Sequence, residues 1–466
     1  MVAIACVLLS AVGFYVSMGL GDQWWLAWLA PVPVLWFSFG PSRLWQGFLV
    51  SFLAFALGDC SLLRAYAGSM PAPVLIMVVA GPALCFASAV MGAKSVRDIH
   101  GPVSAMFAFA AFWATVDFLA AFNRAGGAIS TPAASQVGAP VLIQILSVTG
   151  FGGLTFLLGF VSAGVALGLR MRSAVPAALA AAVFIANAAF GYVRMSTPAE
   201  TSLRVALIES DDAVGKVGKD DQGTALAVID AYVAEIEKLR GAHVALIVLP
   251  ENIARLGPGW RAIAEARLSA AADDVHAALV SGFNTEIDGA QRNVSLAFVP
   301  GEQHPVVYEK RRLVPVLESE HYTPGSAPKV LSRGMGLEIC KDMDFPRMLR
   351  EDETATRPVL LAVPAWDFDR DDWSHARVAM MRSVENAVPM ARAARDGLLT
   401  LNDRYGNLVA RARTVGGFTT VIGDLPLDGR GGGTIYDRIG DAFAWLCMAL
   451  SAGILGARFI QHRKYS

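Results

Sequence analysis

Three residues of the chain have side chains that could together break an ester or an amide bond. Glu251 follows the apolar run Ala-Leu-Ile-Val-Leu-Pro, Lys310 follows Val-Val-Tyr-Glu, and Cys340 follows Leu-Glu-Ile. A thiol is mostly protonated at neutral pH and needs a base to become the nucleophilic thiolate. A lysine ammonium can stabilise the oxyanion that forms when a carbonyl is attacked. The residue types therefore predict a nucleophile, Cys340, with Glu251 as its base and Lys310 as an oxyanion donor.

Each of these residues alone has a more ordinary explanation. A glutamate or a lysine near other charges is most often a solvated surface residue, and a cysteine after an apolar run is most often a small core side chain. All three, however, come at or just beyond the end of a strand-like run, which is where sites are usually built in layered α/β domains. We therefore interpret Glu251, Lys310 and Cys340 as one active site.

The elements that must position these residues lie between residues 195 and 438. Short apolar runs predict strands over Leu203–Glu209, Val244–Pro250, Ala278–Phe283, Val294–Val299, Val306–Glu309 and Leu337–Cys340. Helices are predicted over 223–240, where apolar residues share one face, and over 374–394. The strand-like runs are almost continuously apolar, which is typical of strands covered on both faces. The region is therefore predicted to be a layered α/β domain.

The rest of the chain is much more apolar. The 466 residues are 54% hydrophobic and the mean hydropathy is +0.46, which is too apolar for an average soluble protein. Residues 1–194 carry 12 charged side chains and residues 439–466 carry 4, which leaves 63 of the 79 in 195–438. The sequence therefore predicts a membrane domain over 1–194, a catalytic domain over 195–438, and a transmembrane helix with a cytoplasmic tail over 439–466. The net charge of −1 gives no basic field for a nucleic acid.

Seven apolar stretches long enough to span a membrane precede residue 195. They run over 3–20, 24–40, 44–63, 70–92, 103–122, 141–169 and 173–193, and an eighth runs over 440–457. Pro31 and Pro33 interrupt the second stretch and either break it or make it re-entrant. The first stretch lacks the basic start of a signal peptide, so it is predicted to be a retained helix.

The basic residues predict how these spans are oriented. If the basic C-terminal tail is cytoplasmic, alternate loops place 8 basic residues inside: Arg43, Lys94, Arg97, Arg170, Arg172, Arg458, Arg463 and Lys464. The short outside loops then carry only Arg64 and Arg124. The N-terminus is therefore predicted to lie inside, and the domain between the seventh and eighth spans outside.

The five cysteines indicate neither a disulfide framework nor a metal site. Four of them, Cys6, Cys60, Cys85 and Cys447, fall in apolar segments, so Cys340 has no partner within its own domain. The sequence contains no CxxC motif and no Cys/His spacing typical of a metal site. We therefore expect no metal and no cofactor.

Three motifs resemble the nitrilase, or carbon–nitrogen hydrolase, superfamily. They are Leu-Pro-Glu251-Asn, Tyr-Glu-Lys310-Arg-Arg-Leu-Val-Pro, and Ile-Cys340 followed by Asp-Phe-Pro. The lysine motif, with Glu318 eight residues after Lys310, resembles the apolipoprotein N-acyltransferase family in particular. The stretch that begins Trp28-Leu-Ala-Pro, and Ser135-Gln136 with the Leu-Ile-Gln-Ile-Leu run that follows it, resemble membrane spans of the same family. The resemblance covers nearly the whole chain.

The resemblance implies a multi-pass α-helical membrane domain and a nitrilase-like α-β-β-α sandwich, on the outer side of a bacterial inner (cytoplasmic) membrane. It implies a Glu–Lys–Cys triad that moves an acyl chain from a membrane phospholipid, through a cysteine thioester, to the N-terminal amine of a diacylglyceryl lipoprotein. Glu318 and Glu385 are then expected to orient the triad, and Trp366 to lie near the substrate. We expect a monomer.

This chain departs from the family pattern beside the nucleophile. The family usually has Cys-Tyr-Glu where this chain has Cys340-Lys341-Asp342. Asp342 keeps a carboxylate, whereas Lys341 replaces an aromatic ring with a cation that either lowers the pKa of the thiol or points into solvent. Two alternatives with the same chemistry therefore stay open: a membrane-anchored amidase, and an N-acyltransferase that acts on a different amine. A third is a transporter or binding protein with a catalytically dead domain, against which the intact triad argues.

Overall fold

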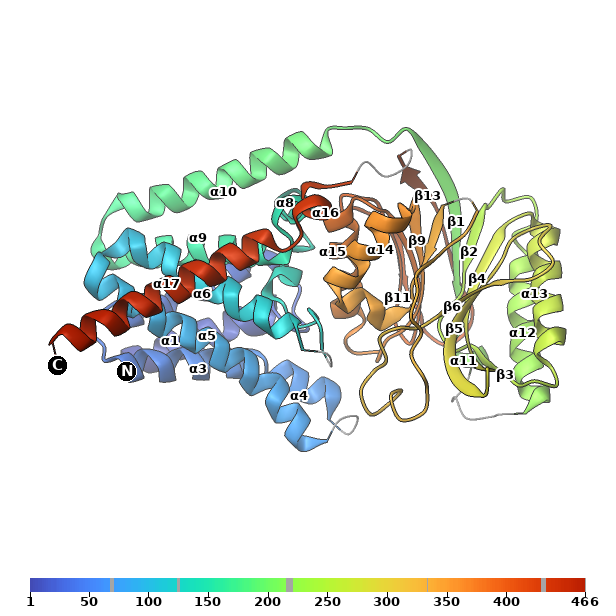
Figure 1. The fold of residues 1–466 in the computed structure, drawn as a ribbon, viewed down its shortest axis with the longest axis horizontal. Helices are drawn as coiled ribbons and strands as arrows, with labels where there is room; N and C mark the ends of the chain where they lie inside the picture. The colour runs from blue at the N-terminus through green and yellow to red at the C-terminus, as the bar shows by residue number, and fades with distance from the viewer. Residues whose placement is uncertain (68–70, 124–125, 215–220, 333, 429–432, 466) are drawn as a thin grey trace. The chain divides into compact units, whose positions relative to one another are not determined.

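The fold is that of a computed structural model, which describes residues 1–67, 71–123, 126–214, 221–332, 334–428 and 433–465. The chain divides into two compact units, Met1–Thr197 with Thr434–Ser466, and Pro198–Gly433 (Figure 1). The first unit is helical and the second contains both β-sheets. All residues predicted to do chemistry belong to the second unit.

The helical unit is built from the apolar stretches of the sequence. Its elements are α1 (Val2–Ser17), η1 (Trp24–Trp28), α2 (Val32–Ser38), α3 (Leu44–Gly58), α4 (Cys60–Tyr66), α5 (Ala72–His100), α6 (Pro102–Ala121), η2 (Pro132–Gln136), α7 (Pro140–Ile143), α8 (Leu146–Thr149), α9 (Phe151–Met171), α10 (Ala174–Met195), α16 (Ile435–Ile439) and α17 (Ala442–Tyr465). In the described part of the chain, five helical segments are long and apolar enough to cross a membrane: Leu44–Tyr66, α5, α6, α9 and α10. The chain is therefore a multi-pass membrane protein.

The remaining predicted spans correspond to shorter apolar helices over Val2–Ser17, Trp24–Ser38, Pro140–Thr149 and Ala442–Gly456. The total of eight spans therefore stays a prediction. The second stretch is broken near its prolines, since η1 ends at Trp28 and α2 begins at Val32. The stretch predicted over 141–169 is interrupted at Gly150, whose φ of +63° ends α8 before α9 begins.

The second unit consists of two sheets with helices on both outer faces (Figure 1). The first sheet has the order β13-β1-β2-β4-β5-β6, with β3 paired to β4, and the second has the order β12-β11-β10-β9-β8-β7. Strands of the first sheet are β1 (Thr201–Glu209), β2 (Leu246–Val248), β3 (Ala254–Leu256), β4 (Ala278–Ile287), β5 (Ala290–Phe298), β6 (Val306–Glu309) and β13 (Thr419–Leu427). Those of the second are β7 (Lys329–Val330), β8 (Met335–Leu337), β9 (Leu360–Trp366), β10 (Met390–Arg395), β11 (Leu398–Asn402) and β12 (Leu408–Arg413). The helical elements are α11 (Asp211–Val214), α12 (Gln222–Glu237), α13 (Arg261–Val275), η3 (Cys340–Asp344), α14 (Pro346–Thr356) and α15 (Asp372–Asn386).

Strand β1 shows why these sequences form a sandwich. Val205 and Leu207 face the core between the sheets, which also contains Leu337 of β8. Ile208 faces the opposite way, into a second core with Ile229 of α12. Because side chains alternate along a strand, a strand that is apolar throughout is stable only when both of its faces are covered. The predicted α-β-β-α sandwich is confirmed.

The predicted strands match observed strands to within a few residues, and the helix predicted over 223–240 is α12. The helix predicted over 374–394 is wrong at its end. Helix α15 ends at Asn386, because Ala387 adopts a left-handed φ of +56° and Pro389 follows, and β10 begins at Met390. Cys340, predicted to end a strand, instead begins the turn η3, three residues beyond β8.

Candidate active site

The candidate active site is built where strands of both sheets end. Glu251 and Lys310 follow β2 and β6 of the first sheet, and Cys340 follows β8 of the second. The backbone N–H of Glu251 donates to the carbonyl of Ala365 in β9 at 3.2 Å, which ties the loop of the first sheet to the second. Gly282 of β4 makes room for this loop, since a β-carbon there would lie 2.5 Å from the Cα of Glu251.

Glu251, Lys310 and Glu318 form a buried ion cluster. Lys310 Nζ donates to Glu251 Oε1 at 2.8 Å and to the two carboxylate oxygens of Glu318 at 2.9 and 2.8 Å. Asn293 of β5 adds two bonds from its Nδ2, to Glu251 Oε1 at 2.6 Å and to Glu318 Oε1 at 2.7 Å. Both bonds to the Glu251 side chain fall on Oε1, so Oε2 accepts no bond from the described residues. That oxygen is therefore available to take a proton.

This cluster fixes the charge of its members. Burial alone would lower the pKa of Lys310, but Glu251 and Glu318 outweigh it and hold the pKa well above its usual value. Burial would raise the pKa of Glu318, but Lys310 and the hydrogen bonds to Glu318 bring it below the usual value. Burial raises the pKa of Glu251, with Lys310 opposing it. Lys310 is therefore an ammonium at neutral pH, and Glu251 is the carboxylate better suited to accept a proton.

Cys340 is held in an unusual backbone conformation. Its φ is +41°, in the left-handed region that few non-glycine residues adopt and that recurs at functional sites. The thiol donates to the carbonyl oxygen of Trp366 at 3.5 Å. Burial and the charge of Glu251 raise the pKa of the thiol well above its usual value, while Lys310 and Arg392 lower it. The resting side chain is therefore a thiol that needs a base, within electrostatic reach of both Glu251 and Lys310.

Comparison with known proteins covers both units. Residues 10–164 match the family described as apolipoprotein N-acyltransferase N-terminal domain, and residues 213–430 match carbon-nitrogen hydrolase. The chain is 24% identical to an apolipoprotein N-acyltransferase of Geobacter metallireducens, over 92% of this chain and 91% of that protein. It is 25% identical to one of Caulobacter vibrioides, over 90% and 86%. A solved CN-hydrolase superfamily protein of Xanthomonas campestris has a TM-score of 0.40 and 20% identity, over 48% of this chain and 90% of that one.

The chain belongs to the apolipoprotein N-acyltransferase family. It is thus an acyltransferase of the carbon–nitrogen hydrolase superfamily.

The residue after Cys340, Lys341, is ion-paired. Its Nζ lies 3.3 Å from Asp344 Oδ2 and 5.9 Å from the centre of the Phe345 ring, and its side chain is 12% exposed. Lys341 is therefore not directed into solvent. The cations that lower the pKa of the thiol are Lys310 and Arg392.

Asp342 holds the turn that begins at Cys340. It is fully buried. Its Oδ2 accepts from the N–H of Ile339 at 3.2 Å, and its Oδ1 accepts from the N–H of Arg312 at 2.8 Å. The first bond fixes the start of η3, and the second ties η3 to the segment that follows Lys310. Asp342 thus joins the two parts of the site that carry Cys340 and Lys310.

Trp366 and Glu385, both predicted to support the site, have different surroundings. Besides accepting from the thiol, Trp366 donates from Nε1 to Asp396 Oδ2 at 2.8 Å, and the guanidinium of Arg395 lies 4.3 Å from the centre of its ring. Glu385 is fully buried on α15 and pairs with Arg382 of the same helix at 2.6 Å. The backbone carbonyl of Trp366 therefore contacts Cys340 directly, whereas the ion pair of Glu385 is made within its own helix.

Sequence reasoning missed three polar residues of this region: Asn293, Tyr308 and Glu338. Asn293 comes directly before the apolar part of β5. A polar amide beside a buried run was therefore the only sequence feature that pointed to a place in the site. Tyr308 lies on β6, two residues before Lys310, which directly follows the strand. The two-residue period of a strand would have placed both side chains on one face. Glu338 follows β8 and is 3% exposed. An acid at the end of an apolar strand is a signal of the kind that identified Glu251.

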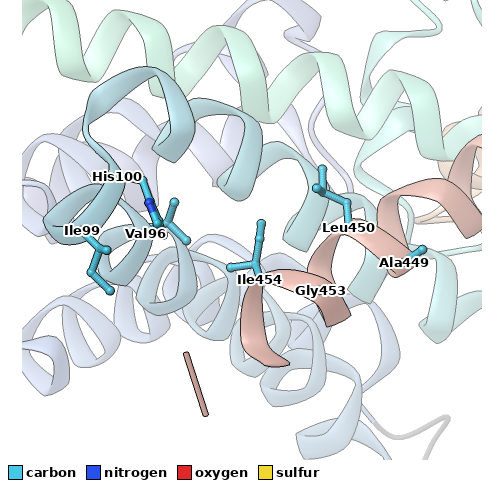
Figure 2. A pocket seen from close by; sticks show the side chains of 7 residues that line it. All are labelled: Val96, Ile99, His100, Ala449, Leu450, Gly453 and Ile454. Carbon is cyan, nitrogen blue, oxygen red and sulfur yellow. The ribbon is translucent and has the colours of Figure 1, made fainter. Parts of the chain in front are cut away.

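A pocket of the helical unit is lined mainly by apolar side chains, with His100 as its polar one. It measures about 380 Å³ and lies between α5 and α17 (Figure 2). The residues that line it are Val96, Ile99, His100, Ala449, Leu450, Gly453 and Ile454. None of them is a residue that the sequence predicts to do chemistry; all of those lie in the sandwich.

Proposed function

We propose that this chain transfers an acyl chain from a membrane phospholipid to the N-terminal amine of a diacylglyceryl lipoprotein, through a thioester on Cys340. One observation carries the proposal: Lys310 and Glu251 form a buried ion pair at 2.8 Å, and the charges of both act on the thiol of Cys340. Family membership supports the choice of donor and acceptor, since the relatives are named apolipoprotein N-acyltransferases.

The first half of the reaction forms the thioester. Glu251 takes the thiol proton as the sulfur of Cys340 attacks the ester carbonyl of the phospholipid, so that a carbon–sulfur bond forms and the carbonyl oxygen becomes an oxyanion. The carbon–oxygen bond of the ester then breaks, and the leaving lysophospholipid oxygen receives the proton from Glu251. Because the resting thiol has a raised pKa, proton removal accompanies the attack rather than preceding it.

The oxyanion is held by Lys310 and by the backbone N–H of Lys341. N–H groups in the first turn of a helix lack partners within that helix, so the start of η3 can present one to the substrate. The three protons of the Lys310 ammonium are shared among one oxygen of Glu251 and two of Glu318. An oxyanion therefore replaces one of the two Glu318 oxygens as an acceptor, and the other oxygen keeps Lys310 in place.

The second half of the reaction transfers the acyl chain. The lipoprotein amine attacks the thioester carbonyl, a carbon–nitrogen bond forms and the carbon–sulfur bond breaks. Glu251 accepts the amine proton and returns it to the sulfur of Cys340, which restores the starting state. The positive-inside distribution of basic residues supports a catalytic unit on the outer side of the membrane, where the apolar helices deliver both lipids laterally.

The test is the mass of the adduct on Cys340. Full-length protein in detergent is incubated with labelled phospholipid alone, and the Cys340 peptide is analysed by mass spectrometry. We expect an added acyl mass and an equal amount of lysophospholipid, followed by transfer of the label when a diacylated lipopeptide is added. Cys340→Ala should show neither adduct nor transfer, and Cys85→Ala, at a thiol of the helical unit, should show both.

Two outcomes would contradict the proposal. N-acylated lipopeptide made by Cys340→Ala would remove Cys340 from the reaction. Release of free fatty acid without N-acylated lipopeptide would instead favour a membrane-anchored hydrolase that uses water as the acceptor.

A further inference from the structure

The hydroxyl group of Tyr308 contacts two carboxyl groups at once. Its oxygen lies 2.8 Å from Glu338 Oε2 and 2.8 Å from Asp342 Oδ2, and all three side chains are buried. A phenol has one proton, and Arg311 Nε adds a donated bond to the same oxygen at 3.1 Å. Two oxygen–oxygen contacts of this length need two protons. One of the two carboxyl groups must therefore carry the second proton.

The surroundings of the two acids decide which of them is protonated. Asp342 accepts two backbone N–H bonds, which favour its ionised form. Burial raises the pKa of Asp342 above its usual value, and Lys310, Tyr308 and Arg311 offset only part of this rise. Burial raises the pKa of Glu338 to about 8; the charges of Asp342 and Asp352 add to this rise and Arg311 opposes it. The second proton therefore belongs to Glu338.

The charged and titratable groups that face Glu338 come from three parts of the fold. Tyr308 and Arg311 come from β6 and the turn after it, Asp342 from η3, and Asp352 from α14. Arg311 donates to Glu338 Oε1 at 3.0 Å and to Asp352 Oδ1 at 3.0 Å. Strand β9 contributes a backbone carbonyl, that of Ala362, which accepts from the N–H of Glu338 at 3.3 Å. One guanidinium therefore binds two carboxyl groups, Glu338 and Asp352, beside a third, Asp342, and a neutral Glu338 lowers the repulsion among the three.

We propose that Glu338 is a positioning residue for acyl transfer and acts in its protonated form. Its carboxylic acid donates to Tyr308, Tyr308 donates to Asp342, and Asp342 holds the turn that presents Cys340. The same aspartate binds the N–H of Arg312, two residues after Lys310, so one proton supports both the nucleophile and the lysine. The inference rests on the proposed function in that Cys340 is taken as the nucleophile.

Loss of this proton should loosen the turn. When Glu338 ionises, a single phenol proton is left between two carboxylates, and Asp342 loses its donor for part of the time. Because the folded pKa lies above the usual 4.5, the stabilisation is present at low pH and is lost as the pH rises through about 8. At pH 9, one unit above that pKa, about one molecule in ten keeps the proton.

Glu338→Gln tests this directly, because an amide donates a hydrogen bond as the acid does but does not titrate. We expect thioester formation on Cys340 in the wild type to fall about tenfold between pH 7 and pH 9. Glu338→Gln should keep the wild-type rate at pH 7 to within about threefold, and its rate should not fall at pH 9.

Tyr308→Phe, which breaks the chain of bonds, should lower kcat with little change in KM. Glu351→Gln, at an exposed acid of α14, should keep the wild-type profile. An unchanged alkaline fall in Glu338→Gln, or a hundredfold loss at pH 7 in a folded protein, would overturn the proposal.

Infrared spectroscopy tests the proton without any substrate. The difference spectrum of wild type and Glu338→Gln should contain the carbonyl stretch of a protonated carboxylic acid at pH 7, and this band should vanish by about pH 9.5. Absence of the band, with thioester still forming on Cys340, would refute the role of Glu338 and leave the proposed function standing. Presence of the band, with no thioester on Cys340, would refute the proposed function and leave the protonation of Glu338 standing.

Discussion

Lys310 contacts both carboxylate oxygens of Glu318, at 2.9 and 2.8 Å, but only one oxygen of Glu251. Glu318 is therefore the counter-ion that binds the lysine through both oxygens, and Glu251 keeps an oxygen that Lys310 does not contact. Glu318→Gln should replace one acceptor oxygen with an amide that faces the ammonium. We expect Lys310 to lose its alignment with the oxyanion and kcat to fall about 10²-fold. N-acylation of a diacylated lipopeptide, followed by mass spectrometry, measures this loss.

A matched control lies two residues further along the chain. Glu320 is exposed, so Glu320→Gln should leave kcat unchanged. Wild-type turnover in Glu318→Gln would show that Lys310 is positioned without its second carboxylate.

Asn293 lowers the proton affinity of Glu251. Its amide donates to the ionised form of Glu251 at 2.6 Å and thereby lowers the pKa of that carboxyl group. Asn293→Ala should therefore raise the pKa of Glu251 and move the acidic limb of kcat/KM to higher pH, because only the ionised carboxylate can accept the thiol proton. We expect this shift to higher pH in the pH profiles of acyl transfer.

Ser295→Ala is the control for this change. Ser295 lies two residues further along β5, on the same face, and is equally buried, but its hydroxyl contacts no carboxylate among the described residues. Its profile should match the wild type. A shift of the same size in both variants would mean that the packing of β5, and not the amide of Asn293, sets the pKa.

The strands of the first sheet could be predicted because local pattern and tertiary position agree there. Glu251 and Lys310 each follow an apolar run that contains a strand, whereas of the run before Cys340 only Leu337 belongs to one. That the three residues act as one catalytic site stays a prediction. Strand β10 shows the opposite case. Its sequence, Met-Ala-Arg-Ala-Ala-Arg, is rich in helix-forming residues, yet all of it is buried between β9 and β11. Pairing with the neighbouring strands overrides the helix propensity of this segment, and nothing in the local sequence indicates that pairing.

The polar contacts within the site could not be predicted from the sequence either. Glu318 was expected only from the resemblance, and nothing in its spacing shows that it binds Lys310 through both oxygens. Glu338 and Tyr308 are 30 residues apart and come together because β6 and β8 belong to facing sheets. Contacts of this kind depend on how the two sheets face each other, which periodicity does not encode.

Gln136 joins two turns of the helical unit, which predicts a stability effect. Trp28 Nε1 donates to its Oε1 at 2.6 Å, and its Nε2 donates to the carbonyl of Trp24 at 3.0 Å; Gln136 is fully buried, and Trp24 is half-buried. Gln136→Leu should leave an indole N–H and a carbonyl without partners in an apolar environment, at a cost of about 1–3 kcal/mol. Thermal unfolding in detergent should show a lower midpoint. Gln23→Leu, at an exposed glutamine of the same unit, should show none, and an equal effect would contradict the prediction.

His375 gives the fold a pH-dependent ion pair. Its Nε2 lies 3.0 Å from Asp371 Oδ2. Burial lowers the pKa of His375, but Asp371, with Asp367 and Asp344, outweighs it and raises the pKa from 6.5 to about 9. The stabilisation is therefore fully present below about pH 6.5 and is lost as the pH rises through about 9. His375→Gln should lower the unfolding midpoint by about 4 °C near pH 6 and by little above pH 9.5. His304→Gln, at an exposed histidine, should leave the unfolding midpoint unchanged at both pH values. An equal drop of the midpoint in His375→Gln at both pH values would show that the side chain acts through packing rather than charge.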